Sequence, residues 1–277
     1  GITRTIAVAV DVLYLDAPLV AACRERIESQ CGVPGRNILL SATHTHSGPV
    51  TCDVLAMQDD PVLPPADPDY LAHLQDGIVS AACQAAGACV PAEIAVTSAM
   101  VDGVGCNRLS PDGARDPEAG IVAVRRRDSG AVMALQLIYS MHPTVMHEDS
   151  TLVSSDFPGY TREHIEAQFP EAKVLYHNGP CGNQSPRYHV KGQTFEESER
   201  LGRRLGSFVV DALESLSDRD YSGDLTVEGL QAHAQLAPRT FPSLDEAEEG
   251  LCRARADYER LKREDAGHGP VRTAECT

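Results

Sequence analysis

The sequence predicts a layered α/β domain, in which a mixed β-sheet core is flanked by helices and a functional site lies at the C-terminal ends of the strands. Two observations predict this class. Short runs of β-branched and apolar residues alternate with segments of helical period, without a repeat or a low-complexity tract. Apolar residues also make up 42% of the 277 residues, which is enough to bury a sizeable core. We expect a single domain over residues 1–277, which begins inside a strand and ends within a helical pattern, as a piece of a longer chain would.

The first strand and the first helix follow each other directly. Residues 2–15 are rich in β-branched residues, and residues 18–31 show helical spacing until Gly32 stops it. Further strands are predicted over residues 37–42, 92–105, 120–127, 131–140, 173–177 and 224–236. Further helices are predicted over residues 69–89, 157–169, 196–216 and 244–264. The turn Asp128-Ser129-Gly130 joins two of these strands as a hairpin, and the proline-rich residues 50–69 form a loop that either covers a site or packs on the surface.

Charge and composition exclude several classes of function. The chain has 24 basic and 40 acidic residues, and its formal net charge of -16 repels the phosphates of nucleic acids and anionic membranes. No apolar run approaches the length of about 18 residues that a spanning helix needs, and no basic leader with an apolar core is present. The nine cysteines form no CxxC pair, which weakly favours a reducing compartment.

Three histidines stand directly after apolar runs. His44 and His46 follow the strand over residues 37–42, and on an extended backbone residues i and i+2 project to the same side. One of these two imidazoles is enough to bind a metal, and the other is then available for substrate or proton transfer. His142 follows the strand over residues 131–140 and precedes a proline that fixes the turn. Catalytic zinc sites use three protein ligands and leave one position for water, so this pattern indicates a metal-dependent hydrolase.

Two further segments place reactive groups after strands. Residues 181–186 bend sharply, so that backbone N–H groups and the Ser185 hydroxyl can face a ligand. Arg108 follows Asn107 at the end of its own strand and is a candidate partner for a carbonyl oxygen or an oxyanion. The alternatives are a glycine-rich turn with an incidental serine and a surface arginine.

An acidic segment lies just beyond His142. His147, Glu148, Asp149 and Asp156 lie in this segment. One of the carboxylates is a candidate to bind the metal or to hydrogen-bond to one of its ligands. An acidic surface loop is the simpler interpretation of Glu148 and Asp149.

Taken in order, these segments resemble the N-terminal catalytic domain of the neutral/alkaline, non-lysosomal ceramidase family. The segments are Ser41-Ala42-Thr43-His44-Thr45-His46-Ser47-Gly48-Pro49, Cys106-Asn107-Arg108, His142-Pro143-Thr144, Ser154-Ser155-Asp156-Phe157-Pro158-Gly159-Tyr160, and residues 178–186. With the third and fourth segments counted as one motif, four motifs in register over about 150 residues are more specific than any one alone, and the resemblance extends from the first strand to at least Leu216.

The resemblance implies a zinc-dependent amide hydrolase that cleaves the N-acyl bond of a ceramide into a fatty acid and a sphingoid base. His44 and His142 would bind Zn2+, while His46 and Arg108 would contact the reacting carbonyl or its oxyanion. Ser185 would match the essential serine of the family.

Asn107 and Gly182 would line the substrate site beside these residues. The sequence departs from the family at Val50-Thr51 and at Asn183-Gln184, both of which border the expected substrate site. The remaining zinc ligands of the family, a Glu and a Tyr, come from later in its sequence and have no matching motif before Thr277. The resemblance also implies a secreted or periplasmic protein, although this chain carries no leader.

Three hypotheses remain from the sequence. The first is a ceramidase-like hydrolase of ceramide or a related N-acyl lipid. The second keeps the metal but takes a small polar amide or ester, because few aromatic residues (5%) and the negative charge give no sign of a lipid-binding surface. The third is a metal-binding domain without turnover.

Overall fold

A mixed four-stranded sheet forms the centre of the computed structural model, which describes residues 3–53, 65–146, 150–238, 240–267, 270–271 and 274. Its strands are β3 (Ala92–Met100), β5 (Glu118–Arg126), β6 (Val132–Tyr139) and β7 (Lys173–Asn178), in the order β3-β5-β6-β7. The first three are antiparallel, and β7 runs parallel to β6. The predicted hairpin is confirmed, since β5 and β6 pair across a turn in which Gly130 has a φ of 74°. The mixed sheet of the predicted fold class is therefore present.

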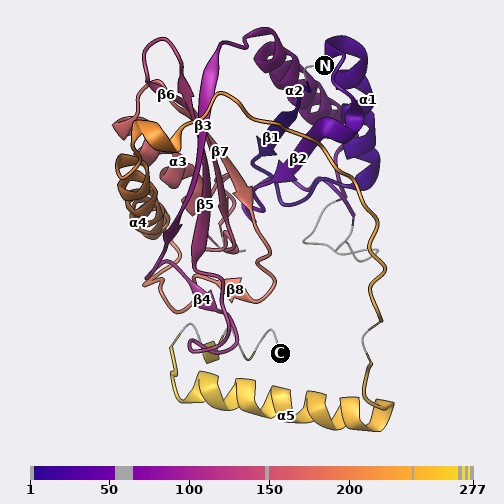
Figure 1. Ribbon diagram of the computed structural model, residues 1–277. Helices are drawn as coiled ribbons and strands as arrows, with labels where there is room; N and C mark the ends of the chain where they lie inside the picture. The colour runs from indigo at the N-terminus through magenta and orange to yellow at the C-terminus, as the bar shows by residue number, and fades with distance from the viewer. Residues whose placement is uncertain are drawn as a thin grey trace.

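Two helices cover one side of this sheet. They are α3 (Phe157–Gln168) and α4 (Phe195–Glu214), which pack on each other and on the sheet (Figure 1). A β-carbon at Gly202 would overlap the backbone of α3, so a glycine is needed where the two helices cross. The main hydrophobic core lies between these helices and the sheet, and its largest buried side chains include Tyr139, Tyr176, Phe157, Leu135 and Leu201.

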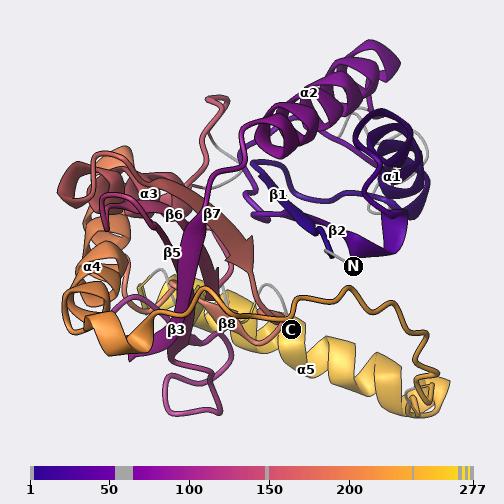
Figure 2. The ribbon, with the colours of Figure 1, turned by 45° about the horizontal axis from the view of Figure 1, so that its top comes forward.

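A smaller layer lies on the other side of the sheet (Figure 2). It contains the parallel strands β1 (Ile6–Val10) and β2 (Ile38–Ala42), covered by α1 (Ala17–Cys31) and α2 (Pro68–Gly87). Gly32 ends α1 in a left-handed conformation with a φ of 63°, as its sequence position predicts. This layer has its own core, formed by Ile6, Cys23, Ile27, Val33, Ile38, Ile78, Val79 and Ala82.

A side-chain contact joins the two layers. The Ser41 hydroxyl on β2 lies 2.6 Å from Nδ1 of His177 on β7. Because β2 and β7 end at this same place, the segments that follow β2, β6 and β7 meet on one side of the molecule.

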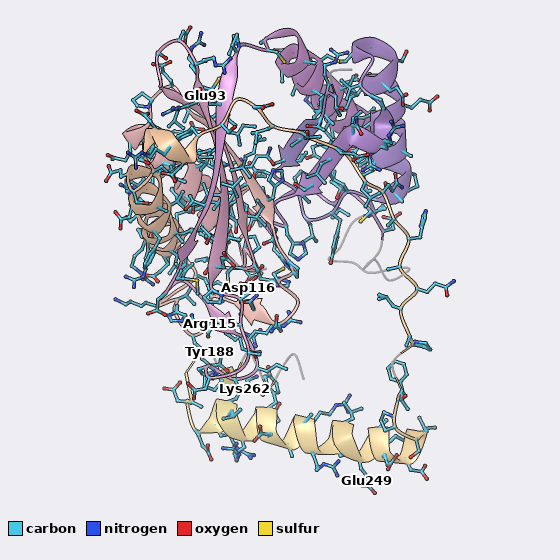
Figure 3. The ribbon with its side chains drawn as sticks, in the orientation of Figure 1. Glu93, Arg115, Asp116, Tyr188, Glu249 and Lys262 are labelled. Atoms are coloured by element: carbon cyan, nitrogen blue, oxygen red, sulfur yellow. The ribbon has the colours of Figure 1, made fainter. Side chains whose placement is uncertain are left out.

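Two very short strands form a third sheet beyond β3. β4 (Cys106–Asn107) pairs antiparallel with β8 (Gln184–Ser185). The predicted strand over residues 92–105 therefore ends earlier, at Met100, and residues 101–105 connect it to β4. Figure 3 shows Arg115 and Asp116 beside β4 and β8, far from Glu93 at the start of β3. Among the described residues, single 3-10 turns lie at Gly35–Asn37 and Asp218–Asp220.

The prediction of a strand over residues 224–236 is wrong. Ser222, just before this segment, forms an isolated bridge to Ile94, residues 224–236 have no regular structure, and α5 spans Leu244–Arg263. The apolar side chains gave a strand-like pattern, yet these residues pair with no strand of the described chain, and Leu230 and Leu236 are 90% and 89% exposed. The helix α5 is present as predicted and has no buried residue. In the part of the chain that the structure describes, no helix is long and apolar enough to cross a membrane.

Candidate metal centre

Two histidines from different layers meet at the ends of β2 and β6. His44 follows β2 by two residues and His142 follows β6 by three, and their Nε2 atoms lie 3.2 Å apart. The two ring centroids are 4.7 Å apart. Both side chains are half-buried, so the pair is accessible from one side.

The backbone that presents His44 is not the extended one that the sequence predicts. His44 has a φ of 68°, a left-handed conformation that is uncommon outside glycine, and its N–H donates to the carbonyl of Val12 at 3.1 Å. The next residue, the buried Thr45, donates its hydroxyl to the carbonyl of Ser154 at 2.7 Å. These contacts anchor the strained segment and turn His44 toward His142.

His46 completes a group of three imidazoles. Its ring centroid lies 5.0 Å from that of His44 and 5.6 Å from that of His142. Its backbone N–H lies 3.4 Å from the carbonyl of Pro143, which links the two histidine segments. His46 is exposed, whereas the other two rings are half-buried. The sequence predicts that the three histidines share one space, and the ring distances agree with this. The cause differs from the predicted one, because His44 has a left-handed backbone conformation where an extended one was expected.

Backbone carbonyls fix the tautomers of the two facing histidines. Nδ1 of His44 lies 3.0 Å from the carbonyl oxygen of Leu13, and Nδ1 of His142 lies 2.8 Å from that of Cys181. Since a carbonyl oxygen only accepts, each Nδ1 carries the proton and each Nε2 is left with an unprotonated lone pair. Burial lowers the pKa of His142, and the charge of Arg108 acts in the same direction, which favours the neutral ring.

When both rings are neutral, their Nε2 lone pairs lie 3.2 Å apart and repel each other unless a proton or a metal ion lies between them. Two nitrogens at about 2.0–2.1 Å from one tetrahedral zinc ion would be roughly 3.3 Å apart. The two imidazoles therefore fit a zinc ion, and the carbonyls of Leu13 and Cys181 are the partners that hold such ligands in orientation.

Cys181 brings a third donor atom that sequence reasoning missed. One ligand atom each of His44, His142 and Cys181 lie within 4.8 Å of one another. Burial raises the pKa of the Cys181 thiol. When the Asn178 amide is turned so that its nitrogen donates to two backbone carbonyls, its oxygen lies 3.1 Å from the sulfur and accepts the thiol proton. The position of Cys181 after a strand, in the glycine-rich turn, was the signal that could have found it.

Ser185 lies in β8, buried and 3% exposed. The carbonyl of its neighbour Gln184 accepts a hydrogen bond from the backbone N–H of His142 at 3.3 Å, so β8 is tied directly to the histidine segment. The Gln184 side chain is also buried; its Oε1 accepts from the N–H of Asp116 at 2.8 Å and its Nε2 lies 3.4 Å from the carbonyl of Pro180. The glutamine therefore stabilises the turn that carries Cys181 and Ser185.

Gly182 lies in the same turn and is exposed. A β-carbon at this position would meet nothing within 4 Å. The residues that the structure describes therefore leave space above Gly182, and its predicted role in substrate binding stays a prediction.

Arg108 lies close enough to the centre for its charge to act on both His142 and Cys181. Its backbone N–H donates to the carbonyl of Asn183 at 2.8 Å. The Asn107 side chain, expected from the sequence to bind substrate, is engaged by the backbone. Its oxygen accepts from the N–H groups of the next turn at 3.0 and 3.2 Å, and its nitrogen donates to a carbonyl at 2.9 Å. These contacts hold the turn that presents Arg108; a contact of Asn107 with substrate stays untested.

The acidic residues beyond His142 divide into two groups. His147, Glu148 and Asp149 lie outside the described residues. Asp156 is fully buried, and both its carboxylate oxygens accept hydrogen bonds. They come from the N–H groups of Val145, Met146 and Phe157 and from the Ser198 hydroxyl. The carboxylate thus stabilises the turn after His142 from inside the fold.

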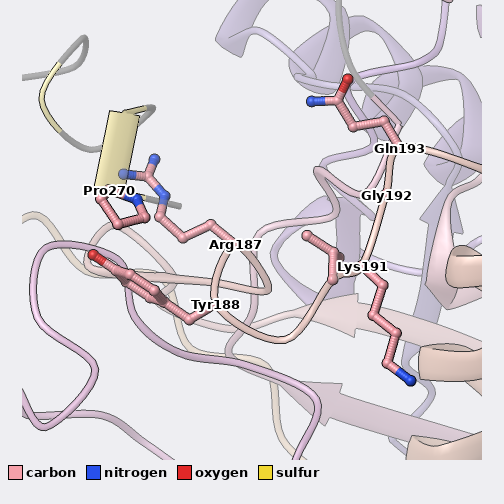
Figure 4. Close-up of a pocket in the computed structure, with 7 residues that line it drawn as sticks. Arg187, Tyr188, Lys191, Gly192, Gln193 and Pro270 are labelled. Carbon is pink, nitrogen blue, oxygen red and sulfur yellow. The ribbon is translucent and has the colours of Figure 1, made fainter. Parts of the chain in front are cut away.

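A pocket of about 540 Å³ opens beside the segment that follows Ser185 (Figure 4). It is lined by Arg187, Tyr188, Val190, Lys191, Gly192, Gln193 and Pro270. Two of these side chains are cationic and two more are polar, but a guanidinium nitrogen of Arg187 donates to the carbonyl of Arg108 at 3.0 Å, and Lys191 extends away from Arg187 in Figure 4. The lining is therefore mixed in character.

Comparison with known proteins agrees with the motifs and with the fold. A family model described as neutral/alkaline non-lysosomal ceramidase, N-terminal, matches residues 2–181, more than half of the chain. A solved structure described as a ceramidase complexed with C2 is 20% identical, with a TM-score of 0.66. The neutral ceramidase from Pseudomonas aeruginosa is 21% identical, with a TM-score of 0.62. Both matches cover 76% of this chain and 36% of the solved chain, so the chain spans about a third of the length of these structures. On this evidence the chain belongs to the neutral/alkaline non-lysosomal ceramidase family.

Proposed function

We propose that this chain forms the N-terminal catalytic part of a zinc-dependent amide hydrolase. The proposed reaction cleaves the N-acyl bond of ceramide or a related N-acyl lipid, giving a fatty acid and an amine base. The observation that carries the proposal is the pair of unprotonated Nε2 atoms of His44 and His142, 3.2 Å apart, each oriented by a backbone carbonyl. Membership of the ceramidase family supports the amide bond as the target.

In this proposal zinc supplies Lewis acidity, which polarises the scissile carbonyl and acidifies water. His44 and His142 hold the ion through Nε2, and the thiol of Cys181 is the third donor within reach. These groups lie at the ends of strands from two layers, so their positions depend on how the layers pack.

The residues around the centre take the remaining roles. His46, exposed and adjacent to both facing rings, receives the proton that water loses as its oxygen adds to the carbonyl carbon, and then passes a proton to the departing amine nitrogen. Arg108 places a positive charge near the oxygen that becomes negative. Ser185 contributes its hydroxyl from the buried edge of the site, and Gly182 leaves space for the substrate beside it.

The pocket lined by Arg187 and Lys191 favours a second candidate substrate. A short amide or ester with an anionic group would suit a mixed lining that contains cations better than two hydrocarbon chains would. The two candidates share the metal centre and differ only in what lies beyond the scissile bond.

The test compares a panel of substrates with the same amide bond. Long-chain ceramides, short-chain ceramides and N-acyl amino acids would be incubated with the zinc-loaded protein, and release of the amine would be measured. His44→Ala is expected to abolish release, while His73→Ala, an exposed histidine on α2, serves as the matched control and should keep it. Hydrolysis of ceramides supports the first candidate, and hydrolysis of N-acyl amino acids alone supports the second. Release that survives His44→Ala would contradict the proposed centre for both.

A further inference from the structure

Two cysteines from different helices meet in the smaller layer. Cys31 is the last residue of α1, and Cys83 lies on the facing side of α2 near its end. Their Sγ atoms are 2.7 Å apart, although 52 residues separate them along the chain. Both are half-buried and pack against the apolar cluster of this layer, which includes Ile27 and Val79.

This distance is too short for two unbonded sulfur atoms at rest. It lies well inside their van der Waals contact distance, and it exceeds a covalent S–S bond of about 2.05 Å by under about 1 Å. The helices already bring the two side chains together, so bond formation needs only a small adjustment of the side chains. We infer that Cys31 and Cys83 form a disulfide that ties the end of α1 to α2.

Formation of the bond needs an oxidant, and a small-molecule disulfide such as oxidised glutathione is sufficient. In the first step the thiolate of Cys31 attacks the small disulfide, which releases one thiol and leaves a mixed disulfide on Cys31. In the second step Cys83 loses its proton and attacks Sγ of Cys31, which releases the second thiol. Two protein thiols are oxidised and one small disulfide is reduced to two thiols.

Oxidation of the pair depends on pH, because the attacking group in each step is a thiolate. In the reduced pair the hydrogen bond with Cys31, followed by burial, raises the pKa of Cys83 to about 11, so Cys83 is mostly a thiol at neutral pH before oxidation begins. Formation of the bond should therefore become faster as the pH rises above neutral.

The bond would act on the layer that carries His44. The segment it closes contains β2 and the histidine motif, and the two helices it joins cover the β1–β2 sheet. Closing a segment of this length restricts the unfolded chain, so the oxidised protein should be more stable than the reduced one. The proposal concerns the covalent state of this layer and holds whichever substrate the protein takes.

Peptide mapping decides the question directly. The chain would be incubated with oxidised glutathione, alkylated under non-reducing conditions and digested. We expect one cross-linked pair of peptides, containing Cys31 and Cys83, which is lighter than the two free peptides by two hydrogen atoms and separates when a reductant is added. Full alkylation of both cysteines in the natively folded, oxidised sample, or pairing of either one with another cysteine, would overturn the inference.

Thermal unfolding gives a second, independent readout. Reduction should lower the Tm of the wild type by several degrees, on the order of 5 °C. Cys83→Ser should unfold close to the reduced wild type and show no response to reductant. Cys89→Ser removes an exposed cysteine just beyond α2 and should respond as the wild type does. A wild-type Tm that is independent of reductant, after mapping has found the cross-link, would show that the bond forms without restraining the fold and would contradict its stabilising role.

Discussion

His44 and His142 are 98 residues apart in the chain, yet their Nε2 atoms lie 3.2 Å apart, and each Nδ1 faces a backbone carbonyl oxygen, which assigns the proton of each neutral ring to Nδ1. The two residues follow strands of different layers, so only the packed fold brings them together. The contact between Ser41 and His177 joins these layers close to the same place. Two facing lone pairs repel each other, and a bound metal ion removes this repulsion. Metal binding should therefore increase the free energy of unfolding.

The first prediction concerns metal content. The purified chain should contain close to one zinc ion per molecule, and His142→Ala should lose most of it, because one imidazole cannot replace two ligands. His73→Ala is the matched control, since this histidine is exposed on α2. Elemental analysis after dialysis checks both. Zinc that stays in His142→Ala at the wild-type level would place the metal elsewhere.

The second prediction concerns the Cys181 sulfur. When cobalt replaces zinc, a coordinating thiolate gives a charge-transfer band in the near ultraviolet, so the band should be present in the wild type and absent in Cys181→Ser. Cys106→Ser is the control, because Cys106 is equally buried but lies outside the group of three donor atoms. An unchanged spectrum in Cys181→Ser would show that the sulfur does not bind the metal, while leaving the two histidines as ligands.

Much of this centre could be predicted from local sequence, because strand ends are local features. The runs before His44 and His142 have clear strand patterns, and α/β sheets collect their sites at such ends. The position of Cys181 after β7 is a signal of the same kind, but it does not indicate that the sulfur lies near the histidines. Its sulfur reaches the histidines because its own carbonyl binds Nδ1 of His142, which is a contact between distant segments.

The strand predicted over residues 224–236 is the clear error. These residues have the apolar pattern of a strand, but a strand also needs a neighbour with free backbone groups, and residue types along one segment carry no information about such a neighbour. The prediction that Asn107 contacts substrate stays a prediction. The structure adds that its amide oxygen accepts from the N–H groups of Leu109 and Ser110, a kind of local bond that asparagine commonly makes and that sequence does not reveal.

The third prediction uses two glycines with opposite surroundings. A β-carbon at Gly105 would overlap the side chain of Met141, next to His142, whereas one at Gly182 would meet open space. Gly105→Ala should therefore lower the free energy of unfolding by about 1–3 kcal/mol, as overpacking does. Gly182→Ala should leave it within about 0.5 kcal/mol.

For Gly182→Ala the informative quantity is KM. If substrate passes over this turn, the added methyl group should raise KM while stability and zinc content stay at the wild-type level. Urea unfolding and steady-state kinetics on the same preparation separate the two effects. An unchanged KM would remove Gly182 from the substrate site.

The last prediction concerns pH and the buried His177. Burial lowers its pKa below the ordinary value of about 6.5. Between these two values the unfolded chain binds more protons than the folded one, so the contribution of His177 to stability is complete above about pH 6.5 and is lost as the pH falls toward the folded pKa. The wild type should therefore lose stability between about pH 8 and pH 5.5, and His177→Gln should lose less.

The comparison has to be made within each protein, because His177→Gln also breaks the contact with Ser41 and lowers stability at every pH. Burial also lowers the pKa of His142, His164 and His189, so part of the loss should remain in the variant. His73→Gln, on the exposed surface of α2, should lose as much stability as the wild type. Urea midpoints at both pH values measure the difference. Equal losses in the wild type and in His177→Gln would mean that His177 binds its proton as readily in the folded chain as in the unfolded chain. The burial of His177 beside β2 would then have no effect on the acid sensitivity of the fold.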